Sequence, residues 1–175
     1  PEAAAMLNVE RLIETRDRVH EELRGKVTDL VAIRREAFKR VLKDVSRPDD
    51  ALASHLGDVF FERRFADIAP FDAVLPVLKA LHPKYTLGIL SNGSSYAEDF
   101  GLEGLISFQG FAQDHCGIEK PDPRIFQIVL ERAGCSAHQL VHVGDSLQND
   151  VAGAIAAGVR SVWHNRDGDS APPDA

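Results

Sequence analysis

A short apolar run that ends in Gly-Asp is the feature that most limits what this chain can fold into. Residues 140–143 are Leu, Val, His and Val, and Gly144 and Asp145 follow directly. Such a run is typical of a buried strand in a parallel sheet. Gly144 would allow the chain to turn sharply at the end of the strand. Asp145 would then stand at the carboxyl edge of the sheet, where open α/β folds bind their ligands.

A second carboxylate, Asp150, lies just inside the helix that we expect after this strand. Two carboxylates held close together repel each other and need a cation or a proton between them. Because their ligand atoms are oxygens, a hard cation such as Mg²⁺ is the natural partner. The structural alternative makes Asp145 a helix cap and Asp150 a first-turn acid favoured by the helix dipole. We interpret His138 and His142 as a surface residue and a strand residue rather than as a ligand pair.

The second half of the chain alternates helical and extended patterns. We expect helices over 74–81, 123–133 and 148–157, and strands over 85–90, 108–112, 140–143 and 160–163. Asp122, Pro123 and Gly134 supply the start and stop signals of the middle helix. This alternation predicts an α/β core over residues 70–166, built on a doubly wound, Rossmann-like parallel sheet. The tail, residues 167–175, is predicted to be disordered.

The first part of the chain, residues 1–69, has the spacing of amphipathic helices. A helical segment around residues 27–45 is followed by a break at residues 46–50. Asp49 or Asp50 can cap the helix that comes next. We therefore expect a separate, wholly helical region before the alternating part begins.

Charge excludes some partners of this chain. The formal net charge of the 175 residues is −7, and the basic residues are scattered. This argues against nucleic acid or an anionic membrane as the main partner. Basic side chains in the helical region either form a solvated face, which we favour, or attract an anionic substrate. They are Arg34, Arg35, Lys39, Arg40 and Lys43.

No apolar stretch approaches the length of a membrane-spanning helix, and no signal peptide is visible at the start. The two cysteines, Cys116 and Cys135, form no CxxC pair and no metal spacing. Free thiols fit a reducing compartment, so we expect a cytoplasmic protein that acts as a monomer or a homodimer.

Polar residues follow two further predicted elements. Ser91, Asn92 and Gly93 come directly after the strand at 85–90. A hydroxyl and free backbone N–H groups at the carboxyl end of a strand can hold a phosphate, although Ser-Asn-Gly is also a common turn. Lys120 opens the sequence Lys-Pro-Asp-Pro before a helix. It either points its charge at a phosphoryl group or a carboxylate, or is simply exposed.

The order of these residues points to one shared site. Ser91, Lys120 and Asp145 follow one another along the chain, each at the end or start of a predicted element. This ordered set resembles the haloacid dehalogenase superfamily of phosphohydrolases. Residues 89–92 are similar to its second motif, whose Ser or Thr binds the transferring phosphoryl group. Lys120 is similar to the lysine of the third motif, which steadies the phosphate and the nucleophile, and residues 144–150 to the fourth, whose acids bind Mg²⁺.

The resemblance implies a Mg²⁺-dependent phosphatase that acts on a small phosphorylated metabolite, a sugar phosphate or a nucleotide. The reaction would pass through an aspartyl-phosphate, and residues 1–69 would form an α-helical cap that closes over the site. The motifs assign catalysis to Ser91 and Lys120, substrate binding to Ser91, Asn92, Gly93 and Lys120, and metal binding to Asp145 and Asp150.

Two other functions remain open. Haloacid dehalogenases proper need no metal, and their equivalent loop lacks the acid of the Gly-Asp pair. The presence of both Asp145 and Asp150 favours the phosphatase, because a dianionic phosphate among carboxylates needs a neutralising cation and a halide does not. The alternatives are a 2-haloacid dehalogenase and a non-catalytic phosphate-binding or interaction module.

The first motif of the superfamily, a strand followed by Asp-x-Asp, is not found in this sequence. The only Asp-x-Asp lies at 167–169, and no apolar run leads into it. We expect the nucleophile upstream of Pro1; a pseudoenzyme that lost this strand is the alternative. Without a strand in the middle, two sheet fragments would face each other across unpaired backbone groups. Each buried unpaired group costs about 1–3 kcal/mol, and a typical domain has only about 5–15 kcal/mol of stability.

Overall fold

A computed structural model describes residues 8–66, 68–115, 117–166 and 168. The chain divides into two compact units, Pro1–Val77 and Leu78–Ala175. This division falls within helix α5 (Val74–Leu81), whereas the sequence predicts a boundary near residue 69. Apart from Gly168, the predicted disordered tail at 167–175 lies outside the described residues.

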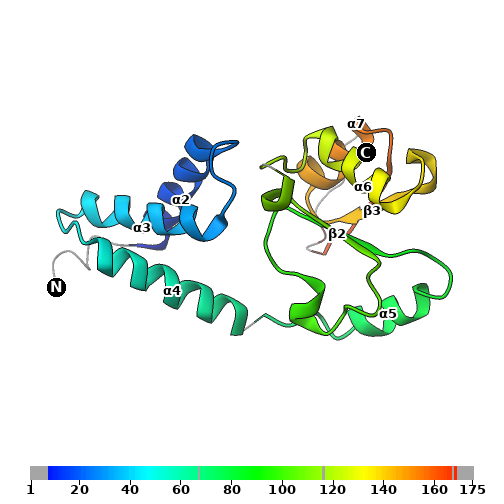
Figure 1. The fold of residues 1–175 in the computed structure, drawn as a ribbon, viewed down its shortest axis with the longest axis horizontal. Helices are drawn as coiled ribbons and strands as arrows, with labels where there is room; N and C mark the ends of the chain where they lie inside the picture. The colour runs from blue at the N-terminus through cyan, green and yellow to red at the C-terminus, as the bar shows by residue number, and fades with distance from the viewer. Residues whose placement is uncertain (1–7, 67, 116, 167, 169–175) are drawn as a thin grey trace. The chain divides into compact units, whose positions relative to one another are not determined.

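Among residues 8–66, the first unit forms the helices α2 (Val9–Leu23), α3 (Leu30–Asp44) and α4 (Asp50–Ala66). Figure 1 shows them side by side, and α3 packs against both of the others. Side chains at the amino ends of all three helices accept hydrogen bonds from first-turn N–H groups, as N-caps do. These capping residues are Asn8, Asp29 and Asp49. The prediction of a helical region is confirmed for the described residues of this unit.

The core of the first unit is small and apolar. Val19, Ile33 and Ala37 are buried and contact one another, and partly buried Leu23, Val27 and Leu30 pack against them. Val27 was expected inside a helix but precedes it, because the carboxylate of Asp29 accepts the N–H of Val31 and starts α3 at Leu30. Val27 therefore contributes to packing but not to the helix.

The described residues of the second unit form four short strands in two parallel pairs. Strand β1 (Gly88–Ser91) pairs with β2 (Phe108–Phe111), and β3 (Val141–Gly144) pairs with β4 (Arg160–Trp163). Within the described residues the two pairs form separate two-stranded sheets. This is the interruption expected from a sequence that lacks the Asp-x-Asp strand. Together with the helices between them, these parallel strands form an α/β, Rossmann-like arrangement.

Helices connect the strands of the second unit. Among them α6 (Pro123–Ala133) forms at the predicted residues, with the Asp122 side chain accepting the N–H of Arg124 and Gly134 in the left-handed conformation. The predicted helix at 148–157 is instead a π-helical turn, η4 (Leu147–Ala152), that continues into α7 (Gly153–Ala156). Short 3₁₀ turns are η1 (Ala97–Phe100), η2 (Ala112–His115) and η3 (Ala137–Gln139).

The core of this unit lies between α6, α7 and the strands. Ile125, Phe126, Ala154 and Val159 are buried and contact one another. Val159 directly precedes β4, so the core joins α6 to the sheet that carries the Gly-Asp turn.

None of the helices in the described part of the chain is long and apolar enough to cross a lipid bilayer.

Two strand predictions need correction. The first strand begins at Gly88 rather than at Tyr85, because the N–H of Tyr85 donates to the carbonyl of Leu81 at 3.0 Å and extends the turn after α5. The strand before Gly-Asp was expected to be buried, yet Val141 and Val143 are 45% and 60% exposed. His142, on the opposite face of β3, contacts Phe126 of α6 and Asp150 of η4, so the prediction is wrong for the face that carries the two valines.

Candidate active site

Lys120 lies at the centre of a polar cluster in the second unit. Its Nζ donates to the carbonyl oxygen of Leu90 in β1 at 3.1 Å and to Oδ1 of Asp150 in η4 at 2.6 Å. The side chains of Lys120 and Asp150 are only 12% and 4% exposed. A charged lysine at this depth needs a paired carboxylate, and Asp150 supplies it.

The backbone of Lys120 is fixed by Asn92, directly after β1. Oδ1 of Asn92 accepts the N–H of Lys120 at 2.8 Å, and Nδ2 of Asn92 donates to the carbonyl of Lys120 at 2.8 Å. The peptide bond from Lys120 to Pro121 is cis. The sequence predicts a substrate-binding Asn92, and the structure gives its amide a further role: it holds the lysine loop against the end of β1.

Ser91 and Gly93 form a tight turn beside this contact. The N–H of Gly93 donates to Oγ of Ser91 at 3.0 Å. Because the hydroxyl oxygen accepts this bond, the hydroxyl proton of Ser91 stays available for an acceptor such as a phosphoryl oxygen. The second predicted motif therefore lies next to the third, through Leu90, Asn92 and Lys120.

Asp150 receives donors on both carboxylate oxygens. Its Oδ1 accepts from Lys120 Nζ and lies 2.8 Å from Nε2 of His142, and its Oδ2 accepts the N–H of Ser146 at 3.0 Å. Burial alone would raise the pKa of Asp150, but the hydrogen bonds from His142, Lys120 and the Ser146 N–H outweigh it and lower that pKa. Asp150 is therefore a carboxylate at neutral pH.

Gly144 is needed at the end of β3 for space rather than for an unusual backbone. A Cβ on this residue would lie 2.2 Å from Cγ of Asp150. Gly144 does not belong to the glycines with positive φ, so the predicted turn at the end of β3 does not depend on a backbone conformation that favours glycine. The glycine instead allows the Asp150 carboxylate to approach the strand.

Asp145 differs from Asp150 in its surroundings. It is exposed, and its main-chain carbonyl accepts the Trp163 Nε1–H at 2.9 Å. Within the described residues its carboxylate has no hydrogen bond or ion pair. A free carboxylate at the carboxyl end of a strand fits Mg²⁺, which takes one or two protein carboxylates and fills its other positions with water and phosphate oxygens. Both oxygens of Asp150 already have protein donors, so this residue is better placed to orient the site than to bind a metal directly.

The described residues contain no cluster of three or more His, Cys, Asp or Glu side chains that could enclose a metal by themselves. Such a cluster would suit zinc or calcium better than Mg²⁺. The exposed carboxylate of Asp145 is compatible with Mg²⁺, whereas the oxygens of Asp150, predicted as a second ligand, already contact Lys120, His142 and the Ser146 N–H.

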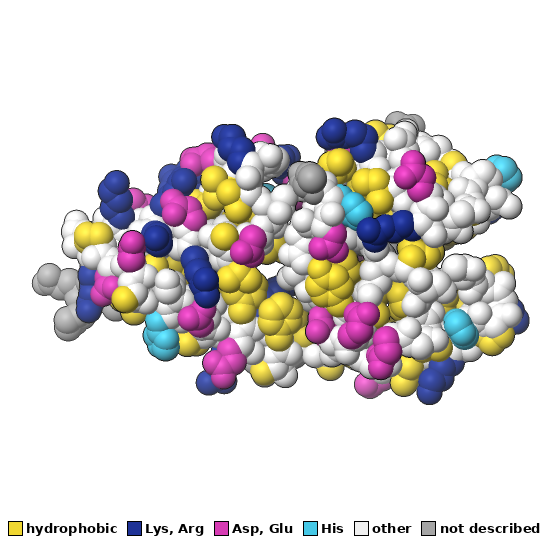
Figure 2. Space-filling model, in the orientation of Figure 1, with side chains coloured by type: hydrophobic (Ala, Val, Ile, Leu, Met, Phe, Trp, Pro, Cys, Tyr) yellow, Lys and Arg dark blue, Asp and Glu magenta, His cyan; other side chains and the backbone are white. Residues whose placement is uncertain are grey.

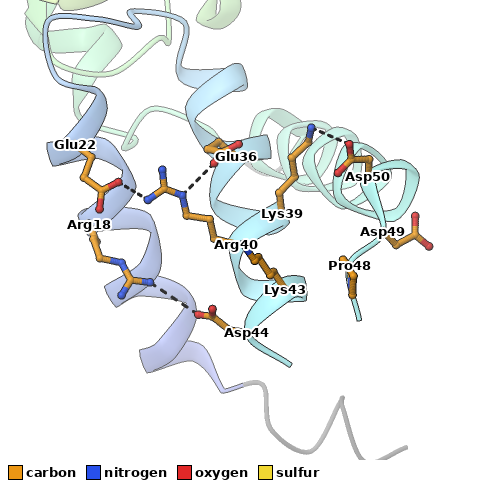
Figure 3. Close-up of a pocket in the computed structure, with 10 residues that line it drawn as sticks. All are labelled: Arg18, Glu22, Glu36, Lys39, Arg40, Lys43, Asp44, Pro48, Asp49 and Asp50. Atoms are coloured by element: carbon orange, nitrogen blue, oxygen red, sulfur yellow. Dashed lines mark hydrogen bonds and ion pairs between the residues drawn. The ribbon is translucent and has the colours of Figure 1, made fainter. Parts of the chain in front are cut away.

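The helical unit contains a recess of about 540 Å³ with charges of both signs. Figure 3 shows Arg40 directed between two glutamates, and Lys39 and Arg18 each directed toward an aspartate. Figure 2 shows the same mixture of basic and acidic side chains over the viewed face of this unit. The residues that line the recess are Arg18, Glu22, Glu36, Lys39, Arg40, Lys43, Asp44, Pro48, Asp49 and Asp50. Because acids outnumber bases here, the recess favours the interpretation of a solvated face over that of an anion site.

The two remaining arginines of this segment also have neighbours. Arg34 lies over the ring of Phe60, 4.3 Å from the ring centre, and Arg35 donates to Asp58 at 2.5 Å. Burial lowers the pKa of Arg34, and repulsion from Arg16 lowers it further. These contacts join α3 to α4 and serve packing within the unit.

Sequence reasoning missed the part that His142 plays. It was interpreted as an ordinary strand residue, yet its ring contacts Asp150 and packs edge-on against Phe126 with ring centres 5.2 Å apart. Residues two apart on a strand share a face, so His142 lies on the same side of β3 as Gly144. That alternation is the signal that could have placed it beside Asp150.

Comparisons with known proteins agree with the geometry. The family model described as haloacid dehalogenase-like hydrolase matches residues 3–158. A phosphoserine phosphatase from Thermus thermophilus is 33% identical over 138 residues, which cover 76% of this chain and 55% of that protein. The chain thus spans about half the length of this curated relative.

Two solved structures are similar over most of the chain. One is a 2-haloacid dehalogenase from Pseudomonas syringae, with 35% identity, a TM-score of 0.77, and coverage of 96% of this chain and 74% of that one. The other is a putative hydrolase of the same superfamily from Bacillus subtilis, bound to magnesium, with 25% identity, a TM-score of 0.71, and coverage of 95% and 78%. With the family model matching most of its residues, the chain belongs to the haloacid dehalogenase-like hydrolases.

Proposed function

We propose that this protein is a Mg²⁺-dependent phosphohydrolase that acts on a small phosphorylated metabolite, a sugar phosphate or a nucleotide. The observation that carries the proposal is the position of Lys120, whose Nζ is held between Asp150 and the carbonyl of Leu90, the residue before Ser91. A cation, a free hydroxyl proton and an unpaired carboxylate, that of Asp145, thus belong to loops at strand ends of one unit. That combination suits the recognition of a phosphoryl group.

The chemistry follows from what each side chain can offer. An aspartate outside residues 1–175, expected upstream of Pro1, attacks phosphorus, and the bond from phosphorus to the leaving oxygen breaks as the aspartyl-phosphate forms. Water then cleaves this intermediate and releases phosphate. Ser91 donates its hydroxyl proton to a phosphoryl oxygen, and Lys120 neutralises charge that builds up during transfer. Removal of one such donor often costs about 10²- to 10³-fold in rate.

A metal fits this scheme at Asp145. Mg²⁺ bound there would neutralise phosphate charge as a Lewis acid. Asp145 would hold it through its free carboxylate, and Asp150 would keep the lysine and the Ser146 N–H in position around it. The magnesium-bound relative from Bacillus subtilis supports this choice of cation.

The nucleophile has a natural place in the sheet. Because β1 and β3 belong to separate two-stranded sheets, a strand between them would satisfy both free edges. A residue at the carboxyl end of such a strand would lie among the loops that carry Ser91 and Asp145. The cap, residues 1–69, would select the substrate.

A 2-haloacid dehalogenase is the second candidate, favoured by the similarity to the Pseudomonas syringae structure. The presence of Asp145 argues against a dehalogenase, because metal-independent halide release does not require this acid. A phosphate-binding module without turnover is the third candidate. We further propose a cytoplasmic protein, monomeric or homodimeric, in keeping with the two cysteines outside any CxxC pair.

One assay separates the three candidates. The full-length protein is incubated with phosphoserine, sugar phosphates and nucleotides, with Mg²⁺ or with EDTA, and phosphate release is measured. Halide release from a 2-haloacid is measured in parallel. Metal-dependent phosphate release supports the proposal; halide release in EDTA supports the dehalogenase; and phosphate binding without turnover supports the binding module.

Single substitutions test the role proposed for each residue. Lys120→Ala and Ser91→Ala should lower kcat of the folded protein by at least about 10²-fold, and Asp145→Asn should weaken activation by Mg²⁺. Lys84→Ala is the matched control, since Lys84 is an exposed lysine of the same unit. Full activity of Lys120→Ala would overturn the role given to this lysine.

A further inference from the structure

His142 shares an acceptor with the lysine of the site. Its Nε2 lies 2.8 Å from Oδ1 of Asp150, the same oxygen that accepts from Lys120 Nζ at 2.6 Å. The side chain of His142 is 11% exposed, and its ring packs at 89° against the ring of Phe126. Two donors from different elements, β3 and the loop before α6, therefore converge on one buried oxygen.

The direction of the bond follows from the charge of Asp150. An ionised carboxylate has no proton to donate, so the hydrogen between the two residues belongs to Nε2 of His142. Burial, the largest effect, lowers the pKa of His142, and the nearby charge of Lys120 lowers it too, against the opposing effect of Asp150. Whether neutral or charged, His142 has a hydrogen on Nε2 when it donates to the Asp150 carboxylate at 2.8 Å.

This bond restricts the motion of two side chains at once. Ser146 N–H holds Oδ2 of Asp150, and His142 holds Oδ1, so the plane of the carboxylate is fixed from both ends. Lys120 Nζ in turn is fixed between that oxygen and the carbonyl of Leu90. Without His142, the Asp150 carboxylate could rotate about the hydrogen bond between its Oδ2 and the Ser146 N–H. Lys120 Nζ, which is bonded to Oδ1, would then move with it. Misplacement of a catalytic group by about 1 Å can cost on the order of 10²-fold in rate.

We propose that His142 is a positioning residue: its Nε2–H bond to Asp150 holds Lys120 Nζ where a phosphoryl group would bind. This inference rests on the proposed phosphohydrolase function for its effect on rate, but the positioning of Lys120 can be measured without activity.

The test compares two amides of different length in the full-length protein. In His142→Gln the side-chain amide can reach the position of Nε2 and donate to Asp150. In His142→Asn the same amide is one methylene shorter and falls near the position of Nδ1, out of reach. We expect kcat to fall by at least about 10-fold in the Asn variant, with KM nearly unchanged, and to recover largely in the Gln variant.

A second readout follows Lys120 directly. Brief acetylation with acetic anhydride, quantified by peptide mass spectrometry, reports how well Nζ is protected relative to exposed Lys84. Lys120 should be protected in the wild type and in His142→Gln, and labelled several-fold faster in His142→Asn. Thermal unfolding checks that both variants are folded at the assay temperature; His142→Asn should unfold at a lower temperature than His142→Gln, because its amide leaves Oδ1 of Asp150 with one donor fewer.

Each outcome has a separate meaning. If the wild type releases no phosphate but the labelling pattern holds, the positioning role stands and the proposed function fails. If the wild type is active while His142→Asn retains its kcat and the protection of Lys120, the positioning role is overturned. Equal losses of rate and of protection in both variants would also overturn it, because they would trace the effect to packing of the ring.

Discussion

Replacement of Lys120 by methionine tests how much the folded protein depends on the pair with Asp150. Methionine keeps an unbranched apolar side chain and removes the charge, so packing is largely preserved. The side chains of this pair are 12% and 4% exposed, and the atoms in contact are 2.6 Å apart. Removing one partner of a buried ion pair typically costs about 3–5 kcal/mol, because the other charge stays buried and uncompensated.

The structure places the expected cost near the lower end of this range. Asp150 keeps two of its three donors in the variant, Nε2 of His142 and the N–H of Ser146. We therefore expect the free energy of unfolding to fall by about 3 kcal/mol, a large part of the roughly 5–15 kcal/mol available to a domain. The matched control is Lys84→Met, at an exposed lysine, which should change stability by less than about 0.5 kcal/mol.

The effect should depend on pH in a defined direction. The pKa of Asp150 is lowered in the folded wild type, so its contribution to stability is present above the pKa of an unfolded aspartate. That contribution is lost as the pH falls through the lower folded value. In Lys120→Met, the hydrogen bond and the charge of Lys120 no longer lower the pKa of Asp150, so this pKa lies higher in the folded variant than in the folded wild type. The difference between the two proteins should therefore be larger at about pH 7.5 than at about pH 5.

Urea unfolding of the full-length protein, followed by far-UV circular dichroism, measures both quantities. The double variant Lys120→Met with Asp150→Asn should be more stable at neutral pH than Lys120→Met alone, since a neutral amide is cheaper to bury than an unpaired carboxylate. A loss below about 1 kcal/mol that does not change with pH would refute the reasoning, because it is the behaviour of a solvent-exposed pair.

Three further substitutions test other contacts. Gly153→Ala places a Cβ 2.9 Å from Cα of Pro121 and should cost about 1–3 kcal/mol in urea unfolding, more than the gain in helix propensity; an unchanged midpoint would contradict this. Asp122→Ala removes the cap of α6 and should cost about 1 kcal/mol. Hydrogen bonds from Arg124 lower the pKa of Asp122, so this cost should shrink as the pH falls through that lowered value, and a cost that grew in acid would be inconsistent with capping. Arg40→Ala removes a half-exposed arginine from its two glutamate partners and should cost at most about 1 kcal/mol, less at high salt; a salt-independent loss would indicate packing instead.

Elements with local signals could be predicted from the sequence. Helix α6 begins and ends at the predicted residues because Asp122, Pro123 and Gly134 act within one turn of its ends. Strand β4 likewise forms at the predicted residues 160–163. In contrast, the start of β1 depends on a hydrogen bond from Tyr85 back to the turn after α5, which composition does not reveal.

The sequence predicts candidate members of the site but not the contacts between them. The order of Ser91, Lys120 and Asp145 suggested one site, and the structure brings the first two together through Leu90 and Asn92. The different surroundings of the two acids depend on the π-helical turn η4, which turns Asp150 back toward β3. A wider helical turn of this kind has no clear sequence signal, so the contact with His142 emerged only from the structure.

The two separate sheets have a consequence for work on residues 1–175 by themselves. Strand edges that carry free N–H and C=O groups pair readily with other chains, and the exposed Val141 and Val143 add an apolar face beside one of them. These residues by themselves should self-associate through their strands and precipitate as their concentration rises. An oligomer seen with them would reflect this edge pairing and would say little about the proposed monomer or homodimer.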